Sequence, residues 1–389
     1  MTRDLVYLDY AATTPVDPQV AELINSLHRD SSAIANPSSV HAAGRRTDGI
    51  VNRAARQVAD LVNCSPSELI WTSGATESDN LAIRGAAQYR RNDGRHLITM
   101  TTEHKAVVDT FKALQAEGFD VTWLSPQPDG RLDIEALERA FRDDTQLVSI
   151  MYVNNETGVV QDINEIGERC RAHDVLFHVD AAQGIGKLPF DLAKLPVDLA
   201  SITSHKIYGP KGVGALYVAD RPRCHIEPLL FGGGQQRGLR PGTLPVPLIA
   251  AFGLAADLAK SAMAVDFEHA QSLHQRLWSG LKSIAGIHMN GSATNAWPGI
   301  LNVSIDDIEG ESLLLLMEPV CVATGSACNS KNQEPSYVLR ALGLSDELAQ
   351  SAVRFSFGRM TQIADIDLAI ERYRTAIAHL RAIAPEAAA

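Results

Sequence analysis

Cysteine and aromatic residues are scarce in this chain. Its 389 residues include five cysteines, and aromatic side chains make up 6%. Cys64, Cys170, Cys224, Cys321 and Cys328 are odd in number, widely scattered and contain no C-x-x-C pair. This distribution argues against a disulfide framework and against a structural zinc site. We interpret the first four as small buried hydrophobic residues.

Positive charge and long apolar runs are also lacking. The formal net charge is -11, which disfavours direct nucleic-acid binding because that surface needs clustered lysine and arginine. The amino terminus, MTRDLVYLDYAATTP, has no basic segment followed by an apolar run, and we find no stretch long enough to span a bilayer. We therefore expect a cytoplasmic protein whose partners are small molecules or other proteins.

Alternating strands and helices dominate the chain from about Leu97 onward. Short β-branched runs alternate with helical patterns, as in HLITM, HKAVVDTFKALQAEG, FDVTWLS and IEALERAF. The runs LVSIMYV and VLFHVD are almost continuously apolar, as expected of strands buried on both faces, and LASIT and VGALYV are further strands. This order predicts an α/β fold with a mainly parallel sheet and helices on both faces.

The pattern changes past about Pro245. Two long helical patterns, at about 248–263 and 267–284, precede a group of short strands and helices. That group ends in an amphipathic helix at about 363–383. A chain of this length accommodates two or three lobes. We predict a large domain of residues 15–257 and a smaller α+β domain of residues 1–14 and 258–389.

Two polar groups follow buried strands in positions suited to a ligand. Asp180 ends the run VLFHVD, where ligands of open α/β sheets bind. A buried carboxylate there needs a cationic partner, and a pyridinium nitrogen is one candidate, with a metal ion or a helix cap as alternatives. Gln183 follows three residues later and can reach a phenolic oxygen of a ligand bound there. The segment SITSHKIYGPKG offers Lys206 and Lys211 as Schiff-base lysines, which chemistry alone does not separate.

Small and hydroxyl residues indicate places for a phosphate. The segment TSGATESDN opens a helical pattern, so its backbone N–H groups and Thr76 can form a phosphate cradle. On this segment alone an ordinary capped helix is the favoured interpretation, because S/T-x-x-E is a common capping box. Thr203 and His205 flank the first lysine and add two more phosphate contacts. The glycine-rich loop FGGGQQRGLRPGT ends at Thr243 and serves either its own subunit or a neighbouring one.

Three further residues are candidates for chemistry. Cys328 lies among glycine, serine and asparagine residues, which are typical of an exposed loop, so it is a candidate nucleophile. Arg354, in AVRFSF, suits a carboxylate clamp because its planar guanidinium pairs bidentately, although a plain ion pair is the alternative. His104 lies between a strand and a helix, where an imidazole can stack on a flat ring or transfer protons.

Together these motifs resemble those of the NifS/IscS-type cysteine desulfurases, which belong to the class V aminotransferase group with the type I pyridoxal-phosphate fold. The resemblance covers nearly the whole chain. The matching stretches are YLDYAATTPVDP, NPSSVHAAG, TSGATESDNLAI, TEHKAV, VNNETGVVQDI, HVDAAQ, SHKIYGPKG, RPGTLPVP, GSAC and EPSYVLRALG. The resemblance implies a seven-stranded, mainly parallel sheet and a smaller domain that carries a mobile Cys328 loop.

The resemblance also implies a role for each candidate residue. Lys206 is similar to the lysine that binds pyridoxal 5′-phosphate, which favours it over Lys211. Asp180 resembles the partner of the pyridinium nitrogen, Gln183 the phenolate contact, and His104 the catalytic residue that stacks on the ring. The other implied cofactor contacts are Ala75, Thr76, Asn155, Thr203, which replaces a serine common in relatives, His205 and, from the second subunit of a homodimer, Thr243.

For the substrate, the resemblance implies that L-cysteine is held through its carboxylate by Asn155 and Arg354. Cys328, in GSAC, is similar to the cysteine that accepts the sulfur. No permanent metal site is expected, although Cys328 can be a transient iron–sulfur ligand. The alternatives are selenocysteine cleavage, another class V pyridoxal activity, and a non-catalytic sulfur-relay or scaffold-binding protein.

The fate of the sulfur is left open by the resemblance. Iron–sulfur cluster assembly, tRNA thiolation and DNA phosphorothioation all use enzymes of this type. Housekeeping relatives continue past the last helix with a tail that helps dock the iron–sulfur scaffold protein, whereas this sequence stops at Ala389. The expectation of a scaffold partner therefore does not include docking through such a tail.

Overall fold

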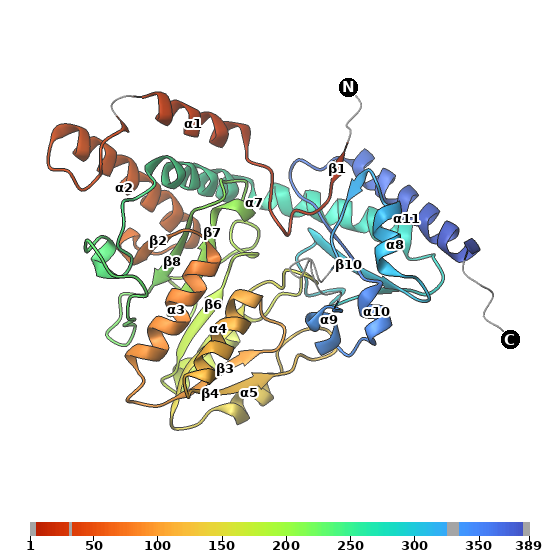
Figure 1. Cartoon of the computed structure of the whole chain (residues 1–389), viewed down its shortest axis with the longest axis horizontal. Helices are drawn as coiled ribbons and strands as arrows, with labels where there is room; N and C mark the ends of the chain where they lie inside the picture. Colours follow the sequence, from red (N-terminus) through yellow and green to blue (C-terminus); the bar gives the residue numbers. More distant parts are fainter. Residues whose placement is uncertain (1–4, 31–32, 325–333, 384–389) are drawn as a thin grey trace.

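The molecule consists of two lobes joined by one long helix (Figure 1). The computed structural model describes residues 5–30, 33–324 and 334–383. The larger lobe, on the left of Figure 1, contains the central sheet. The smaller lobe contains the carboxyl-terminal part of the chain together with the first strand, β1 (Val6–Tyr7), which pairs in parallel with β11 (Val320–Cys321).

The central sheet has seven strands in the order β2-β8-β7-β6-β5-β3-β4. Strand β8 runs antiparallel to both of its neighbours, and all other neighbouring pairs are parallel. The prediction of a mainly parallel seven-stranded sheet is confirmed. The strands are β2 (Leu69–Thr72), β3 (His96–Met100), β4 (Asp120–Leu124), β5 (Thr145–Met151), β6 (Leu176–Asp180), β7 (Leu199–Thr203) and β8 (Gly214–Val218).

Helices cover this sheet because each buries an apolar face against it or against another helix. Helix α3 packs on strands β5 to β8, α6 packs on β6, and α2 packs along α7. Helices α3 and α4 begin just after β2 and β3. The amino termini of both helices therefore lie at the same end of the sheet, where these strands finish. The helices are α1 (Pro18–Arg29), α2 (Ala42–Val62), α3 (Ala75–Tyr89), α4 (Lys105–Ala116), α5 (Ile134–Ala140), α6 (Ile163–Ala172) and α7 (Val246–Leu281).

Helix α7 corrects two expectations. The sequence predicted two helices here, but the structure has one helix of 36 residues, because the segment between the two patterns contains no proline or glycine to interrupt it. By length and composition α7 is also sufficient to cross a membrane, contrary to the expectation that no stretch is. Many of its apolar side chains, including Ile249 and Phe252, are buried in the protein core, whereas Val265 is exposed.

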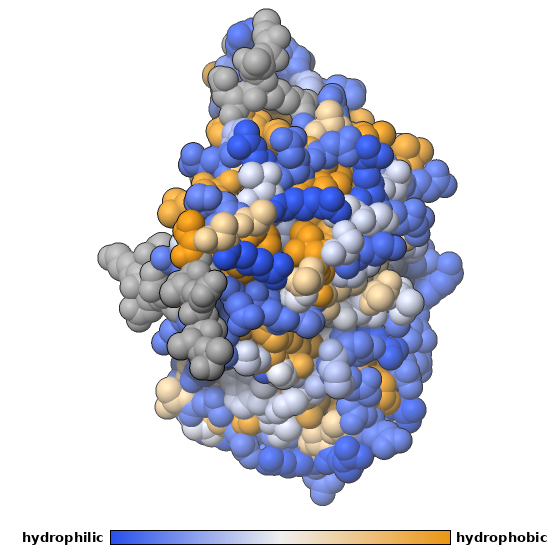
Figure 2. Space-filling model, turned by 90° about the vertical axis from the view of Figure 1, so that its right-hand side faces the viewer, coloured by the Kyte–Doolittle hydropathy of each residue, from blue (hydrophilic) through white to orange (hydrophobic). Residues whose placement is uncertain are grey.

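The smaller lobe has its own hydrophobic core. Its three-stranded antiparallel sheet has the order β12-β10-β9 and packs with α11 and the second half of α7. The predicted boundary at residues 257 and 258 therefore lies inside α7. Figure 2, which faces this lobe, shows apolar patches among polar residues. The elements are β9 (Ile287–Met289), β10 (Ile300–Ile305), β12 (Val353–Ser356), α8 (Gly310–Leu316), α9 (Tyr337–Ala341), α10 (Asp346–Gln350) and α11 (Ile363–Ile383).

Four cysteines lie within the described residues. Cys170 and Cys224 are buried, as predicted. Cys64 and Cys321 are only partly buried, so the prediction of a core position was wrong for them. Cys64 follows the last turn of α2, and Cys321 ends the two-stranded sheet, and both places are close to solvent.

Candidate active site

A cavity of about 930 Å³ lies where β5, β6 and β7 end and α3 and α4 begin. The smaller lobe contributes Arg354 of β12 and Tyr337 of α9 to its wall. The cavity therefore lies between the lobes, at the carboxyl end of the parallel strands, where α/β proteins commonly bind ligands. The predicted site residues that line it are Ala75, Thr76, His104, Asn155, Asp180, Gln183, Thr203, His205, Lys206 and Arg354.

Asp180 provides a buried carboxyl at the base of the cavity. The residue is 5% exposed and ends β6, and its Oδ1 accepts a hydrogen bond of 3.0 Å from the backbone N–H of Ala182. Burial raises the pKa of this carboxyl, and the nearby His104 and Lys206 counteract part of the rise. Among the described residues no cationic side chain forms a salt bridge with Asp180 within 4.0 Å.

His104 is held in one tautomer by the start of α4. Its Nδ1 accepts a hydrogen bond of 3.1 Å from the backbone N–H of Ala106, so the neutral imidazole carries its proton on Nε2. Burial lowers the pKa of His104, and the charge of Lys206 lowers it further while that of Asp180 raises it. A neutral imidazole with a fixed ring plane therefore faces the cavity.

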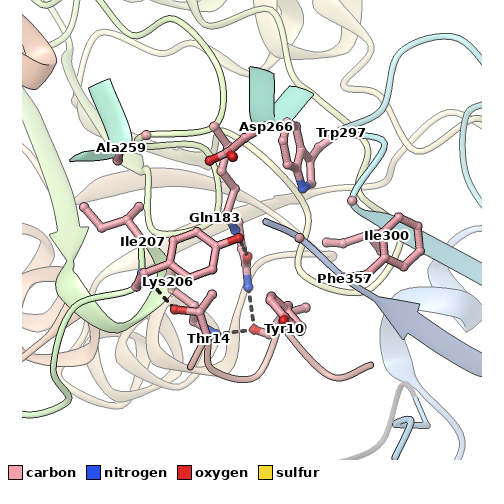
Figure 3. Close-up of a pocket in the computed structure, with 16 residues that line it drawn as sticks. Tyr10, Thr14, Gln183, Lys206, Ile207, Ala259, Asp266, Trp297, Ile300 and Phe357 are labelled. Carbon is pink, nitrogen blue, oxygen red and sulfur yellow. Dashed lines mark hydrogen bonds between the residues drawn. The ribbon is translucent and has the colours of Figure 1, made fainter. Parts of the chain in front are cut away.

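Lys206 and Gln183 both donate hydrogen bonds to the same backbone carbonyl, that of Ala11. Lys206 lies in a 3-10 turn (Ser204–Lys206) after β7, and its Nζ donates to the carbonyl oxygens of Ala11 and Ala12, at 2.8 Å for Ala12. The Nε2 of Gln183 donates to the same Ala11 oxygen at 2.7 Å. Figure 3 shows Gln183 reaching toward the segment that carries Tyr10 and Thr14. The alternative lysine, Lys211, also lines the cavity.

The end of the cavity near α3 offers hydrogen-bond donors. Gly74 precedes α3 and has no side chain to cap the helix, so the first N–H groups of α3 have no side-chain acceptor at the N-cap. The Oγ1 of Thr203 is buried and lacks a hydrogen-bond partner within the described part of the chain. His205 contacts Thr13 Oγ1 at 3.2 Å, and burial lowers its pKa to about 4.

The predicted capping box at the start of α3 is not formed as the sequence suggested. The carboxylate of Glu77 accepts a 2.7 Å hydrogen bond from the backbone N–H of Ser73 and a 2.7 Å contact from Arg240. The carboxylate of Glu77 is therefore paired with Arg240, in the loop that precedes α7, and does not cap α3. This leaves the helix terminus open toward the cavity.

Arg354 connects the two lobes at the cavity wall. Its Nη2 forms an ion pair of 2.7 Å with Asp9, and its Nη1 donates to the backbone oxygen of Asn155 at 2.9 Å. Its Nε is buried and has no hydrogen-bond partner among the residues described. The ion pair that the sequence left open is thus present, and it orients a guanidinium that still lines the cavity.

Two predicted residues lie elsewhere. Thr243 is exposed and does not line the cavity of its own chain. Cys328 lies outside the described residues.

The structure also brings in residues that the sequence did not single out. Glu156, next to Asn155, lines the cavity and accepts a 2.5 Å hydrogen bond from Ser336 at the start of α9. Burial raises the pKa of Glu156 to about 7. Lys187 lies close to Gln183 and Lys206. No sequence signal pointed to the Lys187 contact, because i, i+4 spacing brings side chains together on a helix and residues 182–187 form turns.

Comparisons with known proteins agree on one family. The family model for aminotransferase class-V matches residues 6–368. The chain is 53% identical over 381 residues to the cysteine desulfurase IscS of Escherichia coli O139:H28 (strain E24377A / ETEC), a match that covers 98% of this chain and 94% of that protein.

Solved structures give the same result. A NIFS-like protein superimposes with a TM-score of 0.90 at 36% identity, covering 97% of this chain and 100% of the other. A structure of SspA in complex with cysteine superimposes with a TM-score of 0.81 at 38% identity, covering 90% of this chain and 98% of SspA. These likenesses confirm the predicted fold class, and this chain belongs to the class-V aminotransferase family, among its cysteine desulfurases.

Proposed function

We propose that this chain uses pyridoxal 5′-phosphate to take sulfur from L-cysteine, leaving L-alanine and a persulfide on Cys328. The observation that carries the proposal is the presence of Asp180 and Lys206 in one cavity. A buried carboxyl without a salt bridge suits a pyridinium nitrogen, and an amine opposite it suits an aldehyde. The family membership established above supports the same chemistry.

The other polar groups of the cavity also fit the cofactor. Within the described ranges, the terminus of α3 has no side-chain cap and the Oγ1 of Thr203 has no hydrogen-bond partner, and both suit a phosphate, which binds well at helix amino termini. Ala75, Thr76 and His205 complete this end in the proposal. The ring of His104 suits stacking on the pyridine, and Gln183 has a second N–H available for a phenolic oxygen.

In the proposed reaction, bound pyridoxal 5′-phosphate supplies an electron sink for the substrate. Arg354 and Asn155 hold the carboxylate of L-cysteine, and the amine of Lys206 moves the proton of its α-carbon. The thiolate of Cys328 bonds to the substrate sulfur, and the carbon–sulfur bond breaks with its electron pair remaining on carbon. Protonation of that carbon and return of a proton to the α-carbon give L-alanine, while Cys328 keeps the sulfur as a persulfide for an acceptor.

The proposal includes a homodimer in the cytoplasm. Thr243 is exposed and does not line the cavity of its own chain, which suits a residue that completes the site of a second copy. The cysteines within the described residues are all free, as expected in a reducing compartment. We propose a sulfur-acceptor protein, such as an iron–sulfur scaffold, as the partner. A monomeric chain with full activity would contradict the dimer.

Two substitutions test the proposed function. Lys206→Ala should lower desulfuration by roughly a thousandfold or more, because the amine moves the proton. Cys328→Ser should retain the yellow cofactor yet release no sulfide from L-cysteine. The measurements are absorbance of the bound cofactor and production of sulfide and alanine.

The matched controls are Lys194→Ala, an exposed lysine, and Cys64→Ser, a cysteine away from the cavity lining. Both should leave turnover unchanged. Purified protein that takes up no pyridoxal 5′-phosphate, or a Cys328→Ser variant that turns over normally, would refute the proposal.

A further inference from the structure

A second lysine is hydrogen-bonded to the residue proposed to contact the cofactor's phenolic oxygen. The Nζ of Lys187 donates to the Oε1 of Gln183 at 2.9 Å. The other end of that amide, Nε2, donates to the backbone oxygen of Ala11 at 2.7 Å, and Lys206 donates to the same oxygen. Lys187, Gln183 and Lys206 thus belong to one hydrogen-bonded chain.

The position of Lys187 is unusual for a structural lysine. It lines a small cavity of about 20 Å³, roughly the space of one water molecule, together with Gln183 and Lys206 (Figure 3). Among the described residues no carboxylate lies within 4.0 Å of its ammonium. Burial lowers the pKa of Lys187 to about 7, and the neighbouring charge of Lys206 contributes. A buried charge with no carboxylate beside it in the described part of the chain is costly, so its retention calls for a role.

The chemistry of the two contacts fixes the orientation of the amide. A carboxamide can rotate by half a turn and exchange its oxygen with its NH₂ group at little steric cost. In its protonated form the amine of Lys187 has only donors and so bonds only the oxygen, whereas a backbone carbonyl accepts only from NH₂. Lys187 and Ala11 therefore select the same orientation from opposite ends, and one N–H of Gln183 is left to donate to a ligand.

We propose that Lys187 is a positioning residue, which orients the Gln183 carboxamide so that its N–H donates to the phenolic oxygen of pyridoxal 5′-phosphate. The inference rests on the proposed function and adds a residue to it. Lys187 acts through Gln183 and need not touch the substrate. A donated hydrogen bond stabilises the ionised phenolic oxygen, so its loss makes the bound chromophore easier to protonate.

The test is a pH titration of the absorbance of the bound cofactor, with no substrate present. Lys187→Met keeps the length of the side chain and removes its donors. It should raise the apparent pKa of the chromophore by about one unit, as expected for the loss of one hydrogen bond. Lys187→Arg should restore the wild-type value. Lys194→Met, at a lysine whose side chain is 83% exposed, should have no effect.

A double-mutant cycle distinguishes positioning from a direct effect of charge. Gln183→Ala should raise the chromophore pKa by a similar amount, and adding Lys187→Met should produce no further shift. Equal shifts of Lys187→Met in both backgrounds, or no shift in either, would overturn the inference. If Lys187→Met does not fold, Lys187→Leu gives the same test, because leucine also removes the donors of Nζ and leaves Gln183 unchanged.

Failure of the proposed function has a different signature. In that case the wild-type protein forms no coloured complex with pyridoxal 5′-phosphate, and the inference falls with it. A coloured wild-type complex whose titration is insensitive to Lys187 contradicts the inference alone.

Discussion

Asp180 and Asp198 are both buried in the central sheet, at opposite ends of the neighbouring strands β6 and β7. Asp198 precedes β7 and forms salt bridges with Arg221 at 3.1 Å and Arg223 at 2.7 Å. It also accepts a hydrogen bond of 3.0 Å from the backbone N–H of Phe177. Asp180 accepts one backbone hydrogen bond and faces the cavity.

The contrast between the two aspartates is whether the chain itself provides a cationic partner for the buried carboxylate. The partners of Asp198 satisfy its charge within the chain, so this carboxylate contributes to folding. The partners of Asp180 do not, and burial accordingly raises its pKa. The missing interaction at Asp180 is the one that a cationic ligand supplies, so the two residues should respond to the same substitution in opposite ways.

The largest effect is expected from Asp180→Asn. Loss of the charge opposite the pyridinium should lower kcat for desulfuration on the order of a thousandfold. The free energy of unfolding of the cofactor-free protein should rise at pH 7. The raised pKa means that ionisation of Asp180 in the folded state is unfavourable above the usual aspartate range, and asparagine removes that loss.

The measurements for Asp180→Asn are steady-state kinetics of the cofactor-loaded enzyme and denaturant unfolding of the cofactor-free protein. A variant that loses stability and keeps its activity would reverse the comparison, because Asp180 would then be the structural acid.

The second effect is expected from Asp198→Asn. Arg221 and Arg223 lose their anionic partner, so the free energy of unfolding should fall by about 3 kcal/mol. The kcat of the folded, cofactor-loaded enzyme should be unchanged, because Asp198 does not line the cavity. Denaturant unfolding and kinetics measure the two quantities.

Asp191→Asn provides the control for Asp198→Asn. Asp191 is half-buried and pairs with the exposed Lys194, and asparagine keeps an oxygen for its neighbours, so the substitution should change stability little. Similar losses in the two variants would show that the network around Asp198 contributes nothing beyond a surface ion pair.

Much of the large lobe was predictable because its strands are distinctive in sequence. Continuous apolar runs such as LVSIMYV and VLFHVD correspond to β5 and β6. Strand β2 was not predicted, since a four-residue run carries little periodicity. The number of strands came from the family resemblance. Helix α7 was divided in two because its apolar face changes partner midway, from the core of the large lobe to that of the small lobe.

The site was predictable where a residue sits next to a distinctive strand or motif, as Asp180 and Lys206 do. Contacts between distant segments were not. Ser336 is 180 residues from Glu156, and Ala11 is 172 residues from Gln183. Composition and periodicity describe local structure, so they do not show which distant backbone oxygen or hydroxyl meets a given side chain. The roles of all the predicted site residues stay predictions, those of Asn155, Thr243 and Cys328 included.

The smallest effect is expected from Glu156→Gln. Glu156 is a third buried acid, and its carboxyl is intermediate between those of Asp180 and Asp198 in how far the chain satisfies it. Glu156 has one hydroxyl partner, Ser336, and burial raises its pKa to about 7. Between the usual glutamate pKa and pH 7 the folded chain holds a proton that the unfolded chain has lost, so stability falls as pH rises through that window. Glutamine keeps an oxygen for Ser336 and does not titrate. The variant should therefore match wild type near pH 4 and exceed it at pH 8 on the order of 2 kcal/mol. Unfolding curves at both pH values measure this, and a constant difference between the two proteins would mean that Glu156 is ionised throughout and satisfied within the fold, as Asp198 is.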